Sequence, residues 1–197
     1  MTRERAREVS KDDYHELKVE FMHGRKEYMA PASLEHTDSD FGLQTIFRSF
    51  IRLKKLPHRV CSDALCVYYD DKHYVTPDIA IVADPSMITK NKIQIPPDLV
   101  IEILSPKTVK RDNFAKKDIY GKFGVPEYWT VDTNDKSVIV YKNTGNNLEY
   151  DNMYQLPPRD FDPDVDDLDE DDFITSFHTP LFGDELTINL EDVFFEW

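Results

Sequence analysis

Apolar residues recur at helical spacing between residues 33 and 56. Neighbours on one helical face lie three and four residues apart, so this stretch predicts a long helix with one apolar face. Ser33 is a suitable N-cap, and Pro57 ends the helix because proline has no backbone N–H. The predicted apolar face consists of Leu43, Ile46, Phe47, Phe50 and Leu53.

The other apolar stretches are shorter and predict a sheet with a second helix. Strands are predicted where β-branched and aromatic residues lie between turn-forming residues, at 60–69, 74–82 and 98–104. The remaining predicted elements are a hairpin at 19–29, a helix at 109–123, a hairpin joining 128–132 to 137–141, a strand at 186–188 and a helix at 190–194. This order predicts an α/β (α+β) fold in which a mixed β-sheet is flanked by helices.

The length and composition favour a single domain. Of the 197 residues, 40% are hydrophobic, which is enough for one core. We expect residues 1–13 to form a mobile N-terminal arm and residues 14–197 to form one domain. No run reaches the ~20 apolar residues of a membrane helix and the charged start contains no signal segment, so we expect a soluble, cytoplasmic protein with no membrane partner. Cys61 and Cys66 would face opposite sides of one strand, which favours buried thiols over a disulfide or a zinc site.

The distribution of acidic residues matters more than the net charge of −14. A negative protein is a poor partner for phosphates, which require basic surface. However, residues 157–173 contain nine acidic residues and one arginine, so they carry −8 of the total. We interpret this proline-flanked segment as a solvated insertion, with a nucleic-acid mimic or a cation-binding segment as the alternatives.

Glu102 interrupts the apolar run of residues 99–104, which has the character of a strand covered on both faces. A buried carboxylate costs several kcal/mol unless it is paired, protonated or bound to a cation. Glu102 is therefore either salt-bridged to a lysine or arginine, or a metal ligand.

A metal site needs a second carboxylate, and two Pro-Asp pairs offer one. Asp98 lies four residues before Glu102 on the same strand, hence roughly 13 Å away at ~3.3 Å per residue, which is too far to share an ion. Asp78 opens a different strand, which a hairpin-like connection would place beside the Glu102 strand. Two acids on adjacent strands can bind one hard cation such as Mg²⁺ or Mn²⁺.

A divalent cation held by carboxylates can assist the cleavage of a phosphodiester bond. Such a reaction also benefits from a fixed positive charge near the phosphate. Lys116, Ile119 and Tyr120 share the helical face that must pack on the sheet, whereas Lys117 turns away. Lys116 is thus the candidate cation, and the alternative is a lysine at the edge of the core paired with Asp112.

Several spaced motifs occur along the chain in a fixed order. They are 20–36, Pro77-Asp78, Pro97-Asp98 through Ser105-Pro106, Arg111-Asp112, Lys116 with Tyr120, and 124–129. In these motifs the chain resembles the Uma family of restriction endonucleases. The resemblance covers approximately residues 19–140, with a weaker similarity at 179–194. The resemblance implies the restriction-endonuclease-like fold of the PD-(D/E)xK nuclease superfamily and metal-dependent hydrolysis of phosphodiester bonds, with DNA as the expected substrate.

The resemblance also implies roles for individual residues. The two acids of the superfamily motif correspond to Asp78 and Glu102, which together with the backbone carbonyl of Ile103 would hold one or two Mg²⁺ ions. The lysine usually found two residues after the glutamate would fall at Leu104, so Lys116 is its natural replacement and Lys107 a weaker one.

Further residues before or on the first helix are candidates through the same resemblance. Glu35, or else Glu20, could complete the metal shell, and we slightly favour Glu35. His36 either contacts substrate or packs and caps the helix.

Three functions remain open at the level of sequence, and the third is an acidic protein scaffold with no nucleic-acid contact. The first is a Mg²⁺-dependent endodeoxyribonuclease, expected as a homodimer because cutting both strands of a duplex often needs two sites. The second is a non-catalytic binding or regulatory module on the same fold, whose acidic segment imitates nucleic acid or covers its own cleft. The retained Asp78, Glu102 and Lys116 favour the enzyme, while Leu104 and the acidic total favour the module.

Overall fold

The computed structural model describes residues 19–28, 32–62, 65–90, 92–104, 112–164 and 168–195. The expected mobile arm at residues 1–13 lies outside these ranges.

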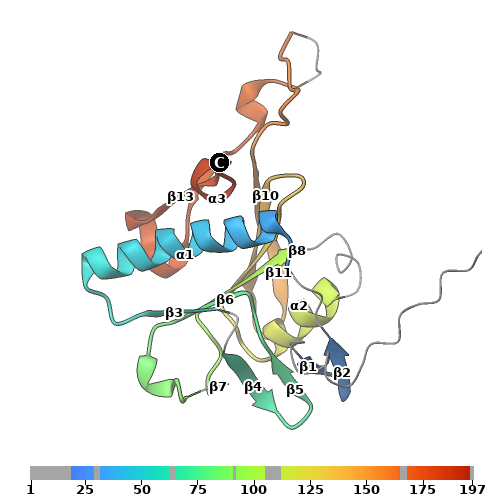
Figure 1. Cartoon of the computed structure of the whole chain (residues 1–197), viewed down its shortest axis with the longest axis vertical. Coiled ribbons are helices and arrows are strands. Elements are labelled where there is room, and N and C mark those ends of the chain that lie inside the picture. Colours follow the sequence, from blue (N-terminus) through green and yellow to red (C-terminus); the bar gives the residue numbers. More distant parts are fainter. Residues whose placement is uncertain are drawn as a thin grey trace, which may run out of the picture.

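A six-stranded mixed sheet forms the centre of the molecule (Figure 1). Its spatial order is β11-β10-β9-β8-β6-β3. The strands are β3 (Arg59–Ser62), β6 (Ile79–Val82), β8 (Leu99–Leu104), β9 (Glu127–Asp132), β10 (Ser137–Asn143) and β11 (Leu148–Gln155). Strands β8 and β9 pair in parallel and the other pairs are antiparallel. The helix α2 (Asp112–Lys122) connects β8 to β9, as a parallel pair requires. The predicted mixed sheet is confirmed.

A second sheet of five short strands has the order β2-β1-β5-β4-β7. Its strands are β1 (Val19–Met22), β2 (Arg25–Tyr28), β4 (Cys66–Asp70), β5 (His73–Val75) and β7 (Lys92–Ile93). The hairpin expected around Gly24 is confirmed as β1 and β2, and Gly24 has the positive φ of 77° that its turn requires.

The sequence-based prediction of single strands at 60–69 and 74–82 is wrong. The chain forms β3 and β4 in the first stretch and β5 and β6 in the second, and in each case the two strands belong to different sheets. Pro77 lies at the second break, where the absence of an N–H prevents a continuous hydrogen-bond ladder. The chain therefore passes from the small sheet to the large one at Pro77, and Asp78 directly precedes β6.

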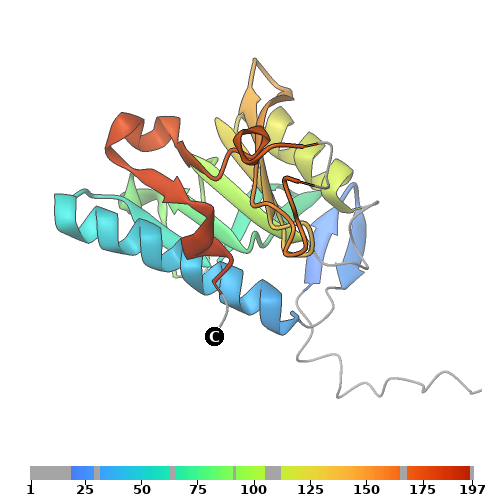
Figure 2. The ribbon, with the colours of Figure 1, turned by 90° about the horizontal axis from the view of Figure 1, so that it is seen from above.

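Helices cover both faces of the large sheet (Figure 2). On one face α1 (Leu34–Lys54) packs through residues such as Phe47 against Leu99 and Ile101 of β8. On the other face Tyr120 of α2 packs with Val100. The alternation along β8 thus divides the core into two layers, and β8 is buried on both sides as predicted.

The predicted long helix is confirmed as α1, with small differences at its ends and on one face. Ser33 is the N-cap, and its Oγ accepts a hydrogen bond from the His36 N–H at 3.2 Å. Leu53, expected on the apolar face, is 78% exposed. It follows Phe47 by six residues, which places it about 120° around the helix from the buried side.

The C-terminal elements pack on α1. They are β12 (Ser176–His178), η4 (Pro180–Glu185), β13 (Thr187–Asn189) and α3 (Leu190–Val193), with β12 and β13 forming a two-stranded sheet. The strand and helix predicted near 186–194 are confirmed, whereas β11 and β12 were not predicted.

The acidic segment lies between β11 and β12 and extends away from the sheet (Figure 1). Residues 157–164, 168, 169 and 171–173 of this segment are exposed or half-buried, and the segment includes one 3₁₀ turn, η3 (Glu170–Asp172). The remaining short 3₁₀ helix, η2 (Pro85–Met87), follows β6.

Two further expectations concern thiols and membranes. Cys61 on β3 is buried as expected, but Cys66 lies on β4 and is only half-buried, so the prediction of two buried thiols on one strand is wrong. No helix within the described ranges is long and apolar enough to cross a membrane.

Candidate active site

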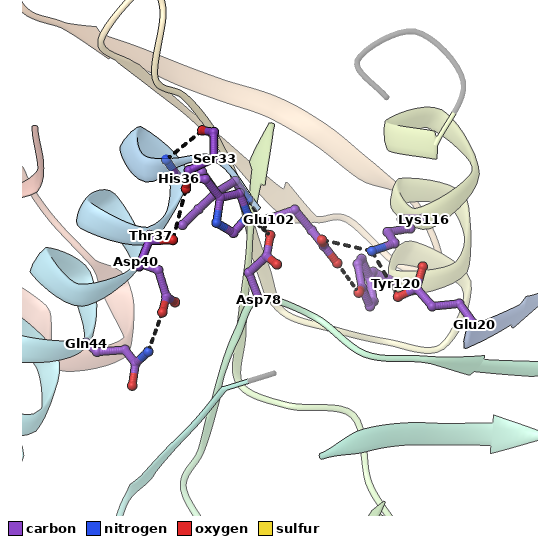
Figure 3. A network of polar contacts seen from close by, with 11 residues as sticks. Glu20, Ser33, His36, Thr37, Asp40, Gln44, Asp78, Glu102, Lys116 and Tyr120 are labelled. Atoms are coloured by element: carbon purple, nitrogen blue, oxygen red, sulfur yellow. Dashed lines mark hydrogen bonds and ion pairs between the residues drawn. The ribbon is translucent and has the colours of Figure 1, made fainter. Parts of the chain in front are cut away.

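Asp78 and Glu102 lie opposite each other where β6 begins and β8 nears its end. The antiparallel pair places Ile79 beside Ile101, so the register continued by one residue sets Asp78 across from Glu102. Both carboxyl groups point to the α2 face of the sheet, because Ala80 and Val100, two residues away on each strand, belong to the core on that face. The predicted adjacency of the two strands is confirmed (Figure 3).

The Asp78 carboxylate is held by one contact from β8 and one from α1. Its Oδ2 accepts the backbone N–H of Ile103 at 2.8 Å and lies 3.3 Å from Nε2 of His36, at the start of α1. Burial raises the pKa of Asp78, which is 3% exposed. The hydrogen bond from His36 and the charge of Lys116 outweigh burial and hold the pKa of this carboxyl below its ordinary value.

Glu102 is bound by two side chains of α2. Lys116 Nζ lies 2.9 Å from Oε2, and the Tyr120 hydroxyl donates to Oε1 at 2.6 Å. Glu20 of β1 completes the group, because its Oε1 lies 3.0 Å from Lys116 Nζ and accepts the Thr76 N–H at 2.9 Å. The network therefore joins both sheets and α2 around one ammonium group (Figure 3).

The predicted orientation of Lys116 is confirmed. Lys116 is 4% exposed and faces the sheet beside Ile119 and Tyr120. Lys117 turns away, with its Nζ 4.1 Å from the centre of the Tyr141 ring. The ammonium that sequence reasoning placed near Glu102 is thus in direct contact with it.

The buried group carries more negative than positive charge. Three carboxyl groups, those of Glu20, Asp78 and Glu102, surround the single ammonium of Lys116. Burial raises the pKa of Glu102 to about 7, and the charges of Asp78 and Glu20 add to this rise against the opposing charge of Lys116. Burial lowers the pKa of Lys116, but Glu102 and Glu20 outweigh it and keep the pKa of Lys116 above its ordinary value. Lys116 is therefore charged, and the three carboxyl groups share this one ammonium.

Glu35 and Glu20, the two candidates for a third metal ligand, lie in different surroundings. Glu35 is exposed in the first turn of α1 and makes no described contact with Asp78 or Glu102. Glu20 is 2% exposed and lies in the network. The slight preference for Glu35 over Glu20 is therefore not supported, because the contact of Glu20 with Lys116 depends on how the two sheets pack.

Two members of the network were not assigned a site role from the sequence. Tyr120 was noted as a packing residue and, with Lys116, as a motif of the family resemblance, but the hydrogen bond of its hydroxyl to Glu102 was not predicted. His36 was left between substrate contact and packing, and it contacts Asp78. A polar atom on an otherwise apolar helical face was the available signal for Tyr120. Lys107, the weaker alternative to Lys116, lies outside the described residues.

The donor set fits a hard divalent cation. Within the described residues no three His, Cys, Asp or Glu side chains are arranged to hold a metal ion. Mg²⁺, however, is usually bound by one or two carboxylates together with waters and substrate phosphates, so Asp78 and Glu102 suffice. The Ile103 N–H points toward Asp78. The N–H and C=O of one strand residue point to the same edge of the strand. The Ile103 carbonyl is therefore a third oxygen on the edge that faces Asp78.

A solved structure shares this fold. The crystal structure of a putative nuclease belonging to DUF820 from Anabaena variabilis ATCC 29413 superimposes with a TM-score of 0.68 at 20% sequence identity. The match covers 93% of this chain and 96% of that chain. The mixed sheet flanked by helices is therefore a restriction-endonuclease-like core.

The family follows from the sequence match. The model of the Uma2 family, described as "Putative restriction endonuclease", matches residues 5–171, and the chain belongs to this nuclease family. Among curated proteins, none matches the chain.

Proposed function

We propose that this protein is a Mg²⁺-dependent endonuclease that hydrolyses phosphodiester bonds in DNA. The observation that carries the proposal is the convergence of Asp78, Glu102 and Lys116 in one buried group of excess negative charge. Two opposed carboxylates beside a fixed ammonium suit a reaction that needs a divalent cation and a positive charge near a phosphate.

The residues that would hold the metal are Asp78, Glu102 and the Ile103 carbonyl. When bound, Mg²⁺ or Mn²⁺ lowers the pKa of a coordinated water and polarises the phosphate. The Ile103 N–H and His36 fix the Asp78 carboxylate in place, so that its orientation does not depend on the metal.

Lys116 is the candidate contact to the reacting groups. An ammonium has three N–H donors, and Glu102 and Glu20 accept two of them. The third donor can orient the attacking water or stabilise charge on the phosphate. Glu20 and Tyr120 act as positioning residues, because one fixes Lys116 and the other fixes Glu102.

DNA and a homodimer belong to the same proposal. The family description as restriction endonucleases supports DNA as the substrate. Cleavage of both strands requires two sites, which a symmetric dimer supplies.

Plasmid nicking by site variants tests the proposal. We expect Asp78→Asn and Glu102→Gln each to lower the Mg²⁺-dependent nicking rate by at least ~100-fold, the scale of losing one electrostatic contact to the reacting group. Removal of the metal with EDTA should stop nicking by the unmodified protein, and Mg²⁺ or Mn²⁺ should restore it.

Glu127→Gln is the matched control. Glu127 is also a buried carboxylate on a neighbouring strand, but it faces the opposite side of the sheet, where it accepts hydrogen bonds from Trp129 and Thr179. This variant should keep its nicking rate within a few-fold. Nicking that survives both site substitutions, or an unmodified protein that never nicks DNA with Mg²⁺, contradicts the proposal.

A further inference from the structure

A basic pocket is lined by residues at the C-terminal end of α1 and in β3. Its volume is about 460 Å³, within the range of small-molecule sites. Arg59 on its wall pairs with Val82, which lies four residues along β6 from Asp78. The pocket is thus roughly 13 Å along the sheet from the acidic pair, at ~3.3 Å per residue.

Four of the residues that line the pocket are cationic and exposed. They are Arg48, Arg52, Lys55 and Arg59. Within the part of the chain that the structure describes, no carboxylate forms an ion pair with any of these four. Arg48 donates to the neutral amide oxygen of Gln44, at 3.0 Å from its Nη2. Four cations without acidic partners are unexpected in a chain with 38 acidic residues.

The helix dipole accounts for only part of this cluster. Cations near a helix C-terminus interact favourably with the last carbonyl groups, which explains Arg52 and Lys55. Arg59 belongs to β3 and not to the helix, and Arg48 lies before the last turn. Arg48 and Arg59 therefore add positive charge to the pocket lining that the helix dipole does not explain.

Other residues of the pocket lining are apolar. We call the apolar lining residues Leu56, Pro57 and Val60 the apolar side. His58 also lines the pocket, and its ring packs on Phe182 at 5.1 Å between centroids.

We propose that this pocket binds a phosphorylated nucleotide. The arginines match phosphate oxygens, because the planar guanidinium can donate two parallel hydrogen bonds to one phosphate. The apolar side accommodates the base, and 460 Å³ is sufficient for a nucleotide. The nucleotide is either free or a unit of a nucleic-acid strand, and binding in either form is independent of the cleavage proposed above.

Calorimetric titration in EDTA tests the proposal without catalysis. The probes are deoxyadenosine diphosphate, deoxyadenosine, inorganic phosphate and a single-stranded oligonucleotide of about ten nucleotides. We expect the diphosphate to bind at least ~10-fold more tightly than the nucleoside or inorganic phosphate. Tighter binding of the oligonucleotide assigns the pocket to a strand, and tighter binding of the diphosphate assigns it to a free nucleotide.

Substitutions at exposed residues provide the control for specificity. Arg52→Gln/Arg59→Gln should weaken nucleotide binding at least ~10-fold, since each change removes a charged donor to phosphate. Lys72→Gln, in the turn between β4 and β5, removes an exposed cation elsewhere and should have no effect. Equal affinity of the double variant and the unmodified protein overturns the proposal.

Two further results would also overturn it. Inorganic phosphate that binds as tightly as the nucleotide means that the apolar side contributes nothing. A peptide of residues 157–173 that binds more tightly than the nucleotide assigns the pocket to the acidic segment of a second copy. None of these results bears on nicking by the Asp78 and Glu102 site, because EDTA excludes the metal and the double variant leaves that site unchanged.

Discussion

Lys116 is the residue on which the buried site depends electrostatically. Its ammonium is the common partner of Glu20 and Glu102, at 3.0 and 2.9 Å. A buried carboxylate left without such a partner costs several kcal/mol. Lys116 therefore keeps two acids close together in a folded protein, in addition to the role that we propose for it in cleavage.

Replacing Lys116 tests this structural role. We expect Lys116→Met to lower the free energy of unfolding at pH 8 by about 3–5 kcal/mol, because methionine keeps the packing but leaves two buried carboxyl groups unpaired. Urea denaturation followed by circular dichroism measures this change. Adding Glu20→Gln to Lys116→Met should recover part of the loss, and a loss below about 1 kcal/mol for Lys116→Met would show that Lys116 is not the essential partner.

The sequence was sufficient to predict the main residues of the site but not its full membership. Glu102 was identifiable because a carboxylate in a two-sided apolar run needs a partner, and helical spacing selected Lys116 over Lys117. Glu20 was only one of two options, because its contact with Lys116 depends on how the two sheets pack. Local spacing carries no information about contacts between separate sheets.

At the level of elements, α1 and α3 approach unusually closely at Gly42. A Cβ at this position would lie 2.6 Å from the backbone oxygen of Asp192 and 3.3 Å from that of Val193. Glycine therefore allows the C-terminal helix to pack directly on the helix that carries His36.

Gly42→Ala tests this contact. Alanine favours a helix interior by about 1 kcal/mol, but a rigid backbone clash costs about 1–3 kcal/mol, so we expect net destabilisation. The melting temperature should fall, while Ser49→Ala, an exposed change on the same helix, should leave it nearly unchanged. A variant that is more stable than the unmodified protein would mean that α3 moves away from α1 at no cost.

The elements that were predicted well have strong local signals. The helix α1 has a cap, an apolar period and a proline after its end, and the hairpin of β9 and β10 has a turn between two alternating runs. The sequence analysis predicted one strand where the chain forms β3 and β4, and one strand where it forms β5 and β6. It could not separate them, because apolar content does not reveal which sheet a segment joins. The strand β11 was missed because it is largely polar and half-exposed.

At the level of the whole molecule, charge is unevenly distributed. Residues 157–173 carry −8 of the net −14, and residues 157–164, 168, 169 and 171–173 are exposed or half-buried. The basic pocket at the end of α1 has the opposite sign. A segment of this charge repels DNA at low salt, whatever its other roles.

Deleting residues 159–172 tests the effect of the acidic segment. The net charge of the remaining chain is −6. We expect DNA affinity, measured with Glu102→Gln protein to prevent cleavage, to increase several-fold at ~50 mM salt and the increase to shrink at ~200 mM, where screening is stronger. Unchanged affinity at both salt concentrations would show that the segment is only a solvated insertion.

The central claim is that Asp78 and Glu102 bind one divalent ion, and anomalous diffraction from crystals soaked in Mn²⁺ tests it most directly. The account predicts an anomalous peak between the two carboxyl groups, at about 2.0–2.3 Å from an oxygen of each. The same soak of Glu102→Gln crystals should give a much weaker peak. No peak between Asp78 and Glu102 in the unmodified protein, with Mn²⁺ bound elsewhere or nowhere, would contradict the account.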